Sequence, residues 1–187
     1  MTFRTMCAIA AGVMLTAGCS TETRDNGAVA VEDNIAIAAA ETLSADLRDP
    51  DGATLARATL SQAGDAVQVR LEAAGLPAGT YGAHVHRTGR CDAPDFDSAG
   101  AHWNPTGHQH GGENPQGPHL GDLPNLTVAA DGSGAISFDI AGATLRDGNN
   151  PVLDEDGAAV IVHAEPDDYR TDPSGNSGAR IACGVIG

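Results

Sequence analysis

Short stretches of alternating apolar and polar residues recur along most of the chain. In the run Val67-Gln68-Val69-Arg70-Leu71, the apolar side chains would lie on one face of a strand and the polar side chains on the other. Turn signals rich in Gly and Asp separate such runs. The pattern predicts eight strands, at residues 41–48, 53–61, 66–73, 80–87, 126–130, 135–140, 158–163 and 181–186. Eight strands are enough for a closed or nearly closed antiparallel barrel, so we expect an all-β fold.

Two of the predicted connections are too long for simple hairpins. Residues 88–123 are rich in Gly, Pro, Asn, Asp and His, and residues 164–179 contain two prolines and three aspartates. Long loops without regular structure inside a compact domain usually carry function. We therefore expect a site where these two loops fold over one wall of the barrel.

Residues 1–18 are predicted to be a secretory signal rather than part of the fold. A single basic residue, Arg4, precedes an apolar run at residues 6–15 that is too short to span a bilayer. The sequence up to Cys19 resembles a bacterial lipobox, in which the cysteine becomes the lipid-modified first residue of the mature protein. Thr16 stands where a lipobox usually has leucine, and ordinary export with cleavage nearby is the alternative.

A flexible tether is predicted between this signal and the folded domain. Residues 19–38 are polar at first and then alanine-rich, with no sustained strand or helix period. Residues 39–187 are then a single folded domain of ordinary size. We expect an exported, periplasmic protein that is lipid-anchored to a bacterial membrane, and Ser20 after the cysteine favours the outer membrane.

The net charge of the chain limits the kinds of molecule that it is expected to bind. It has 25 acidic residues against 10 basic residues, all of them arginine, and a formal net charge of −15. A chain this acidic would repel phosphates, so nucleic acid is not an expected partner. We expect contact with a membrane only through the lipid anchor.

Cysteine usage supports export. Cys7 lies in the signal and Cys19 is the predicted lipidation site, which leaves Cys91 and Cys183. An isolated pair in an exported domain predicts a disulfide, with two free buried thiols as the alternative. The bond would close a loop of about 90 residues and contribute about 4 kcal/mol in the chain-entropy model.

Six of the seven histidines and one aspartate form a candidate metal centre: His84, His86, His102, His110, His119, Asp122 and His163. His84 and His86 are two residues apart on a predicted strand, so both rings leave the same face and can share an ion, which His163 could join. Such an imidazole set suits Cu(II), whereas three imidazoles and a carboxylate from the long loop suit tetrahedral Zn(II). Counting His102 in both sets gives each ion four ligands, because an imidazolate can bridge two metals. His108 is left over as a solvated residue.

Six segments together resemble the copper/zinc superoxide dismutase family. They are HVH at 84–86, GAHWNP at 100–105, HGG at 110–112, HLGDL at 119–123, VH at 162–163 and GARIACGVIG at 178–187. The resemblance runs in order from about residue 40 to the last residue, and the second long loop looks more like the bacterial periplasmic branch than the cytosolic eukaryotic one. It implies an eight-stranded antiparallel Greek-key β-barrel or sandwich with two long functional loops.

The resemblance also implies roles for particular residues, with one copper ion and one zinc ion per subunit. The implied copper ligands are His84, His86, His102 and His163. The implied zinc ligands are His102, His110, His119 and Asp122. Asp167 matches an aspartate that accepts hydrogen bonds from one copper-side and one zinc-side histidine. Arg180 matches an arginine that attracts and orients the superoxide anion, and Cys91 and Cys183 match an intrasubunit disulfide.

The implied activity is superoxide dismutation. Two superoxide anions and two protons would become dioxygen and hydrogen peroxide by alternation of Cu(II) and Cu(I), with His102 delivering a proton and zinc holding the structure. A non-catalytic copper/zinc carrier on the same barrel is the alternative. Both a monomer and a homodimer are compatible with the resemblance.

An anionic substrate and an acidic chain raise the question of how the substrate is attracted. A cleft lined by metal ions and Arg180 can focus a positive potential over about one Debye length, ~8 Å at physiological salt. The chain has no lysine to assist. Our hypothesis is that Arg87, Arg90 or Arg170 supplies further positive charge.

Overall fold

The computed structural model describes residues 41–187, and within them it confirms the all-β prediction. They form nine strands and one short 3-10 helix. The strands are β1 (Thr42–Arg48), β2 (Thr54–Ala63), β3 (Ala66–Ala73), β4 (Gly79–Tyr81), β5 (Ala83–His86), β6 (Leu126–Val128), β7 (Ala135–Ala141), β8 (Ala158–His163) and β9 (Arg180–Ile186). The helix is η1 (Asp97–Ala99). The predicted signal at 1–18, the tether at 19–38 and Cys19 lie outside the described residues, among which no helix is long and apolar enough to cross a membrane.

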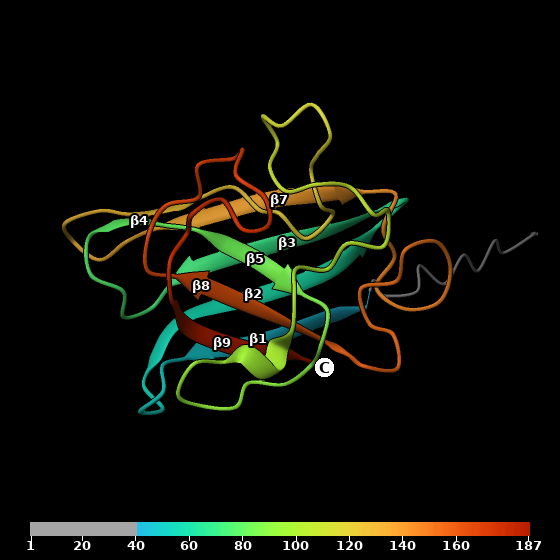
Figure 1. Ribbon diagram of the computed structural model, residues 1–187. Helices are drawn as coiled ribbons and strands as arrows, with labels where there is room; N and C mark the ends of the chain where they lie inside the picture. Colours follow the sequence, from blue (N-terminus) through green and yellow to red (C-terminus); the bar gives the residue numbers. More distant parts are fainter. Residues whose placement is uncertain (1–40) are drawn as a thin grey trace, which may run out of the picture. The chain divides into compact units, whose positions relative to one another are not determined.

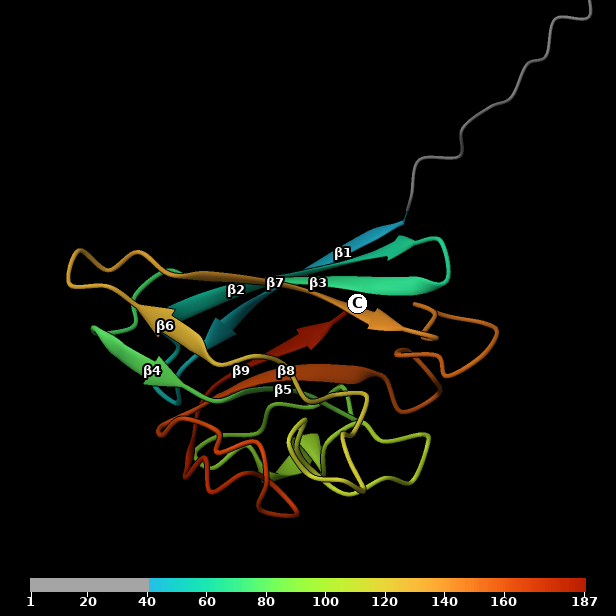
Figure 2. The same cartoon turned by 90° about the horizontal axis from the view of Figure 1, so that it is seen from above.

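Seven strands form one curled antiparallel sheet (Figure 1). Their order is β5-β8-β9-β1-β2-β3-β7, so the last strand of the chain lies beside the first, and β4 and β6 form a separate two-stranded ladder. Figure 2 shows β1, β2, β3 and β7 in one layer and β5, β8 and β9 in the other. The long loops gather on the outer side of the second layer, away from the first.

The apolar alternation in the sequence packs the space between these layers. In β3, Val67, Val69 and Leu71 are fully buried, while Gln68 and Arg70 on the opposite face are exposed. Burying one such side chain contributes about 1.5–3 kcal/mol. By contrast, every residue of β8 is buried, because one face packs into the core and the other lies beneath the long loops.

The segment predicted as one strand at 80–87 is divided by Gly82 into β4 and β5, which belong to different sheets. The N–H of Gly82 donates to Glu165 O at 2.8 Å, and its carbonyl accepts the N–H of His163 at 2.8 Å. A Cβ at Gly82 would lie 2.8 Å from the Cβ of Ser177. This contact allows only glycine, and the break brings the second long loop against the start of β5.

Candidate metal centre

Two neighbouring strands carry three of the candidate ligands. His84 and His86 alternate with Val85 on β5, so both rings face the long loops while Val85 packs into the core. β5 pairs with β8, which ends at His163 after an irregularity in the register at Val162/His163. All three histidine side chains are buried.

The first long loop adds its ligands by pairing along the other edge of β5. Isolated bridges place His86 opposite His102 and His84 opposite Asp122. Val85 anchors both loop segments, since its N–H donates to Gly121 O and its carbonyl accepts the N–H of Trp103, each at 2.8 Å. Backbone pairing therefore fixes residues far apart in sequence around one point.

Four imidazole nitrogens at this point are buried and have no hydrogen-bond partner within the described part of the chain. They are His84 Nδ1, His86 Nε2, His102 Nε2 and His163 Nε2. A candidate ligand atom of each of these four residues lies within 4.8 Å of the others. Buried polar atoms are rarely left without a partner, because desolvation without a hydrogen bond costs about 1–3 kcal/mol each. The four atoms fit a single ion with imidazole ligands, and this donor set suits copper.

A second cluster surrounds Asp122 Oδ1. It lies 2.9 Å from His102 Nδ1, 3.0 Å from His110 Nδ1 and 3.2 Å from His119 Nδ1. The Nδ1 atoms of His102 and His119 are 3.4 Å apart. A tetrahedron with metal–ligand bonds of about 2.0–2.1 Å has edges of about 3.3 Å, so the set fits zinc. His84 also lies within 4.8 Å of this cluster, but its Nε2 is hydrogen bonded elsewhere and its Nδ1 belongs to the first set.

His102 belongs to both clusters. Its Nδ1 faces Asp122, and its Nε2 is one of the four unpartnered atoms of the first set. The structure thus brings together all seven predicted ligands, with His102 between the two sets.

Asp167 joins the two sets from the second long loop. His84 Nε2 lies 2.8 Å from Asp167 Oδ2, and His110 Nε2 lies 3.0 Å from Asp167 Oδ1. A carboxylate accepts hydrogen bonds, so each ring donates from Nε2 to Asp167 and turns its Nδ1 towards its cluster. A Cβ at Gly175, whose φ is +62°, would lie 2.7 Å from His110 Nε2 and would overlap Asp167.

Asn125, which sequence reasoning did not connect with the site, holds Asp167 in place. The side-chain oxygen of Asn125 accepts the N–H of Asp167 at 2.8 Å, and its amide donates to the Asp167 carbonyl at 2.9 Å. Asp172 was also missed, and it accepts the N–H of His110 at 2.7 Å. Both contacts join residues more than 40 positions apart, so only the fold reveals them.

Burial determines which histidines are neutral before any metal binds. Burial lowers the pKa of His84 to about 3 and the pKa of His163 to about 4. It also lowers the pKa of His86 and of His102. The first set therefore offers neutral nitrogen lone pairs at neutral pH, as metal binding requires.

The second set contains two charged groups before any metal binds, the Asp122 carboxylate and the His110 ring. Burial opposes ionisation of Asp122, but hydrogen bonds from the three histidines outweigh it and hold the pKa of this carboxyl well below its usual range. Burial also opposes the charged form of His110, but hydrogen bonds to Asp122 and Asp167 raise its pKa to about 9. An ion at this set would replace the proton on His110 Nδ1, which faces Asp122, while Nε2 would keep its hydrogen bond to Asp167.

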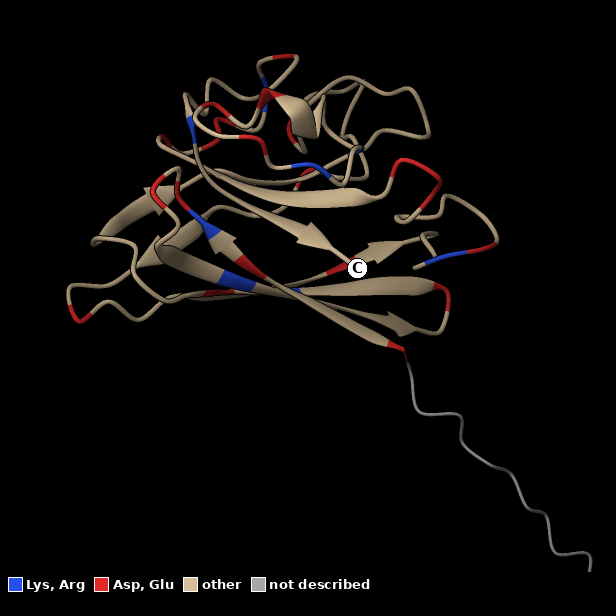
Figure 3. Cartoon of the chain, turned by 90° about the horizontal axis from the view of Figure 1, so that it is seen from below, with Lys and Arg blue, Asp and Glu red and all other residues tan. Residues whose placement is uncertain are grey.

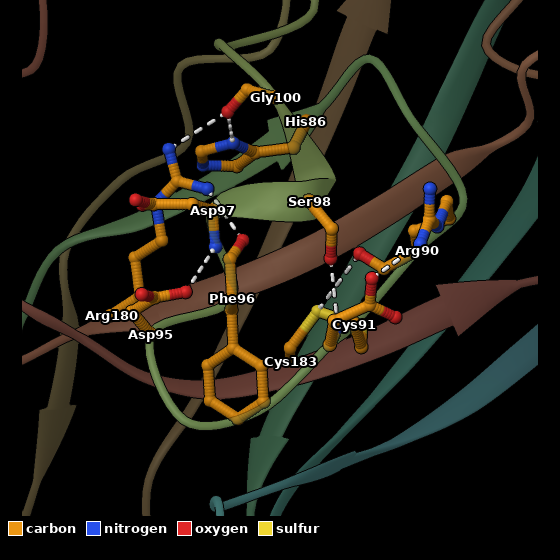
Figure 4. Close-up of a disulfide and its surroundings, with 11 residues drawn as sticks. His86, Arg90, Cys91, Asp95, Phe96, Asp97, Ser98, Gly100, Arg180 and Cys183 are labelled. Atoms are coloured by element: carbon orange, nitrogen blue, oxygen red, sulfur yellow. Dashed lines mark hydrogen bonds and ion pairs between the residues drawn. A yellow bond between two sulfur atoms is a disulfide. The ribbon is translucent and has the colours of Figure 1, made fainter.

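Arg180 lines the open side of the first set. A cavity of about 600 Å³ is bordered by His86, His102, His163 and Arg180, among others. The Arg180 guanidinium donates to Phe96 O at 2.7 Å and to Gly100 O at 2.8 Å, as Figure 4 shows. The same Gly100 carbonyl accepts from His86 Nδ1 at 2.9 Å, so the arginine and a candidate copper ligand share an anchor.

The predicted disulfide between Cys91 and Cys183 is present, with the two Cα atoms 5.7 Å apart. It joins the first long loop to β9, and Cys183 belongs to a small apolar cluster with Phe96 and Ile161. Figure 4 shows the disulfide and Phe96 in this region. Because Phe96 is buried there, its carbonyl is held where Arg180 can reach it. The disulfide and this cluster therefore support the position of Arg180.

The structure also bears on the predictions for His108 and for the three arginines that were expected to attract the substrate. His108 is exposed, as expected for a solvated residue, and is in neither set. Two of the three arginines considered for attracting the substrate are ion-paired, Arg90 with Asp92 and Arg170 with Glu113.

Comparisons with known proteins place this geometry in a family. The family model described as "Copper/zinc superoxide dismutase (SODC)" matches residues 54–186. A protein of Aquifex aeolicus named "Superoxide dismutase [Cu-Zn] 1" is 42% identical over 144 residues, covering 76% of this chain and 85% of that protein. "Superoxide dismutase-like protein YojM" of Bacillus subtilis is 49% identical over 111 residues, covering 59% of this chain and 57% of that protein.

A solved structure supports the same assignment. The crystal structure of a SOD-like protein from Bacillus subtilis matches with a TM-score of 0.72 at 39% identity, covering 79% of this chain and 99% of that one. The family model covers well over half of the 187 residues, and the fold agrees. The chain belongs to the copper/zinc superoxide dismutase family.

Proposed function

We propose that this protein is a superoxide dismutase, which converts two superoxide anions and two protons to dioxygen and hydrogen peroxide. The observation that carries the proposal is the set of four unpartnered imidazole nitrogens beside an open cavity that Arg180 also lines. A metal store needs the ligands, but it has no use for a half-buried cation at the wall of a cavity beside them.

We assign His84, His86, His102 and His163 to one copper ion, and His102, His110, His119 and Asp122 to one zinc ion. Bound copper would supply the one-electron oxidation and reduction of superoxide, and bound zinc would hold the His102 ring and the first long loop. Asp167 keeps the Nε2 protons of His84 and His110 in place, which leaves their Nδ1 atoms free to bind.

Arg180 binds and orients the substrate. Its two anchoring hydrogen bonds fix the guanidinium at the cavity wall, and a planar cation with free N–H groups suits a small anion. His102 also has a role in the reaction, because its Nε2, when it is not bound to a metal, would hold a proton at the cavity and donate it to the peroxide product. Burial lowers the pKa of His102, so a proton on this ring is readily given up.

The alternative is a copper/zinc carrier without dismutase activity. One matching relative is named only superoxide dismutase-like, so family membership alone does not decide catalysis. The presence of every candidate ligand together with Arg180 supports the enzyme.

Pulse radiolysis tests the proposal. The chain should be prepared with copper and zinc, and with zinc alone, and superoxide decay followed directly. We expect fast decay that requires copper in the protein and falls when Arg180→Ala is introduced. If the chain binds one copper but removes superoxide no faster than free copper does, the carrier function is correct.

We further propose that the protein is exported and that Cys19 carries a lipid. The Cys91–Cys183 disulfide supports export, because disulfides persist in oxidising compartments. Mass spectrometry of the mature protein tests the lipid, and an unmodified Cys19 would exclude the anchor.

A further inference from the structure

The eight arginines of residues 41–187 differ in what balances their charge. Six form ion pairs with carboxylates: Arg48 and Arg57 with Asp46, Arg70 with Glu72, Arg90 with Asp92, Arg146 with Glu41, and Arg170 with Glu113. Arg180 donates to two backbone carbonyls. Among these eight arginines, only the side chain of Arg87 has neither an ion pair nor a hydrogen bond with the described residues.

Arg87 is unusual because acidic side chains are common throughout this molecule. Figure 3 shows Asp and Glu spread over the loops and turns, with few basic residues among them. The formal net charge of −15 leaves a surplus of carboxylates that could pair with an exposed arginine. Because no carboxylate of the described residues forms an ion pair with Arg87, its positive charge can attract an anion from solution.

The backbone of Arg87 is held next to the candidate ligands. It follows His86 directly, and its N–H donates to Ala101 O at 3.1 Å. Its Nε lies 3.3 Å from the position that a Cβ on Gly100 would take. The carbonyl of Gly100 is the anchor of Arg180, so the two arginines approach the same residue.

Arg87 lines a second cavity, of about 400 Å³, together with Asn104, His119 and Asp172. This cavity and the larger one beside Arg180 have Ala101, His102 and Pro173 in common. The two cavities are therefore neighbours on either side of the ring that bridges the two metal sets.

The charges lining the two cavities follow the same pattern. The larger cavity has Asp97 and Arg180, and the smaller one has Asp172 and Arg87. The Asp172 carboxylate lies 3.9 Å from His119 Nε2, and without Arg87 it would have no arginine to balance it among the residues that line the smaller cavity. An anion approaching from that side would then be repelled.

We propose that Arg87 is a second anion-guiding residue, which keeps the approach to His102 open to superoxide from the side of the smaller cavity. This inference rests on the proposed dismutase function. It selects one of the three arginines that the sequence left open, because the carboxylates of Asp92 and Glu113 already balance Arg90 and Arg170. Arg87 acts through its field and does not take part in the chemical step.

The test compares Arg87→Gln with a matched control, Arg70→Gln, which removes the same charge from an exposed, ion-paired position on β3. A third variant, Asp172→Asn, removes a negative charge instead of a positive charge from the same cavity. It keeps an oxygen that can accept the His110 N–H. The second-order rate constant for superoxide decay is measured by pulse radiolysis on the copper- and zinc-loaded chain. Azide affinity, measured from its visible absorption band, gives a readout that does not depend on activity.

Arg87→Gln should lower the rate constant about two- to threefold at low ionic strength, where the Debye length is ~30 Å, and by less at physiological salt, where it is ~8 Å. Azide affinity should fall by a similar factor. Arg70→Gln should change neither quantity by more than about a tenth, and Asp172→Asn should raise both.

Two results would overturn the inference. One is an Arg87→Gln variant that matches Arg70→Gln in both rate and azide affinity. The other is a loss of rate that is the same at every ionic strength, which would show a structural effect instead of a long-range one. If the unmutated chain does not dismutate superoxide, the proposed function fails, and the azide titration still tests the guiding role separately.

Discussion

Asp167→Asn should weaken zinc binding more than copper binding. Asp167 accepts three hydrogen bonds: Oδ1 accepts from His110 Nε2 at 3.0 Å and from the N–H of Tyr169 at 2.6 Å, and Oδ2 accepts from His84 Nε2 at 2.8 Å. Asparagine keeps the shape of the side chain but replaces one oxygen with an NH₂ group that cannot accept. One histidine then loses its partner, and the other loses the charge of its partner.

The magnitude follows from these bonds. A hydrogen bond to a charged group contributes about 1.5–3 kcal/mol, which agrees with the usual 10–100-fold effect of replacing a residue that supports a metal ligand. His84 is also held by the pairing of β5 with β8, whereas His110 lies on the long loop. We therefore expect zinc affinity to fall about 100-fold and copper affinity about 10-fold.

The assay is a competition titration of the metal-free chain against a chromogenic chelator, carried out separately with each metal. Asp168→Asn is the matched control, because Asp168 is the neighbouring carboxylate and bonds to Thr171 and Asn176 but to no histidine. Circular dichroism confirms that both variants fold. Zinc affinity of Asp167→Asn within about threefold of the control, or a greater loss of copper than of zinc, would refute the reasoning.

Three further predictions concern stability. Cys183→Ser, which opens the bond to Cys91 across 92 positions, should lower the free energy of unfolding by about 4–5 kcal/mol in urea titrations, and an effect below about 1 kcal/mol would contradict the loop-closure argument. Leu60→Ala removes a fully buried side chain and should cost about 2–5 kcal/mol in the same assay, with no change in metal stoichiometry. In the metal-free chain, burial lowers the pKa of His84 to about 3 and the pKa of His163 to about 4, so both rings stay neutral in the folded state. The unfolded chain binds protons on these histidines below about pH 6.5. The free energy of unfolding is therefore highest above that pH and decreases as the pH falls towards 4. Thermal melts from pH 7 to pH 4 check this, and a melting temperature that does not change over that range would be inconsistent with buried neutral histidines.

The alternation of residues predicted most of the fold because one face of each strand packs into the core. Val67, Val69 and Leu71 show the correspondence directly. The same alternation did not reveal the break in the segment at 80–87. Gly82 interrupts that segment because Ser177, in a distant loop, approaches too closely for a side chain.

The residues of the two candidate ligand sets could be predicted because six of only seven histidines lie in segments that resemble a known family. Strand geometry also placed His84 and His86 on one face. The supporting contacts were not predictable. Asn125 and Asp172 are common residue types in turn-like segments, and their partners lie elsewhere in the chain.

The position of His102 between the two clusters has a thermodynamic consequence. Under the proposed ligand assignment, each ion binds one nitrogen of the same ring, so the occupancy of one site changes the affinity of the other. Linkage requires this coupling to be equal in both directions, whatever its sign. Copper would alter zinc affinity by the same factor by which zinc alters copper affinity. The order in which the metals are supplied can then change the rate of loading, but not the final occupancy at equilibrium.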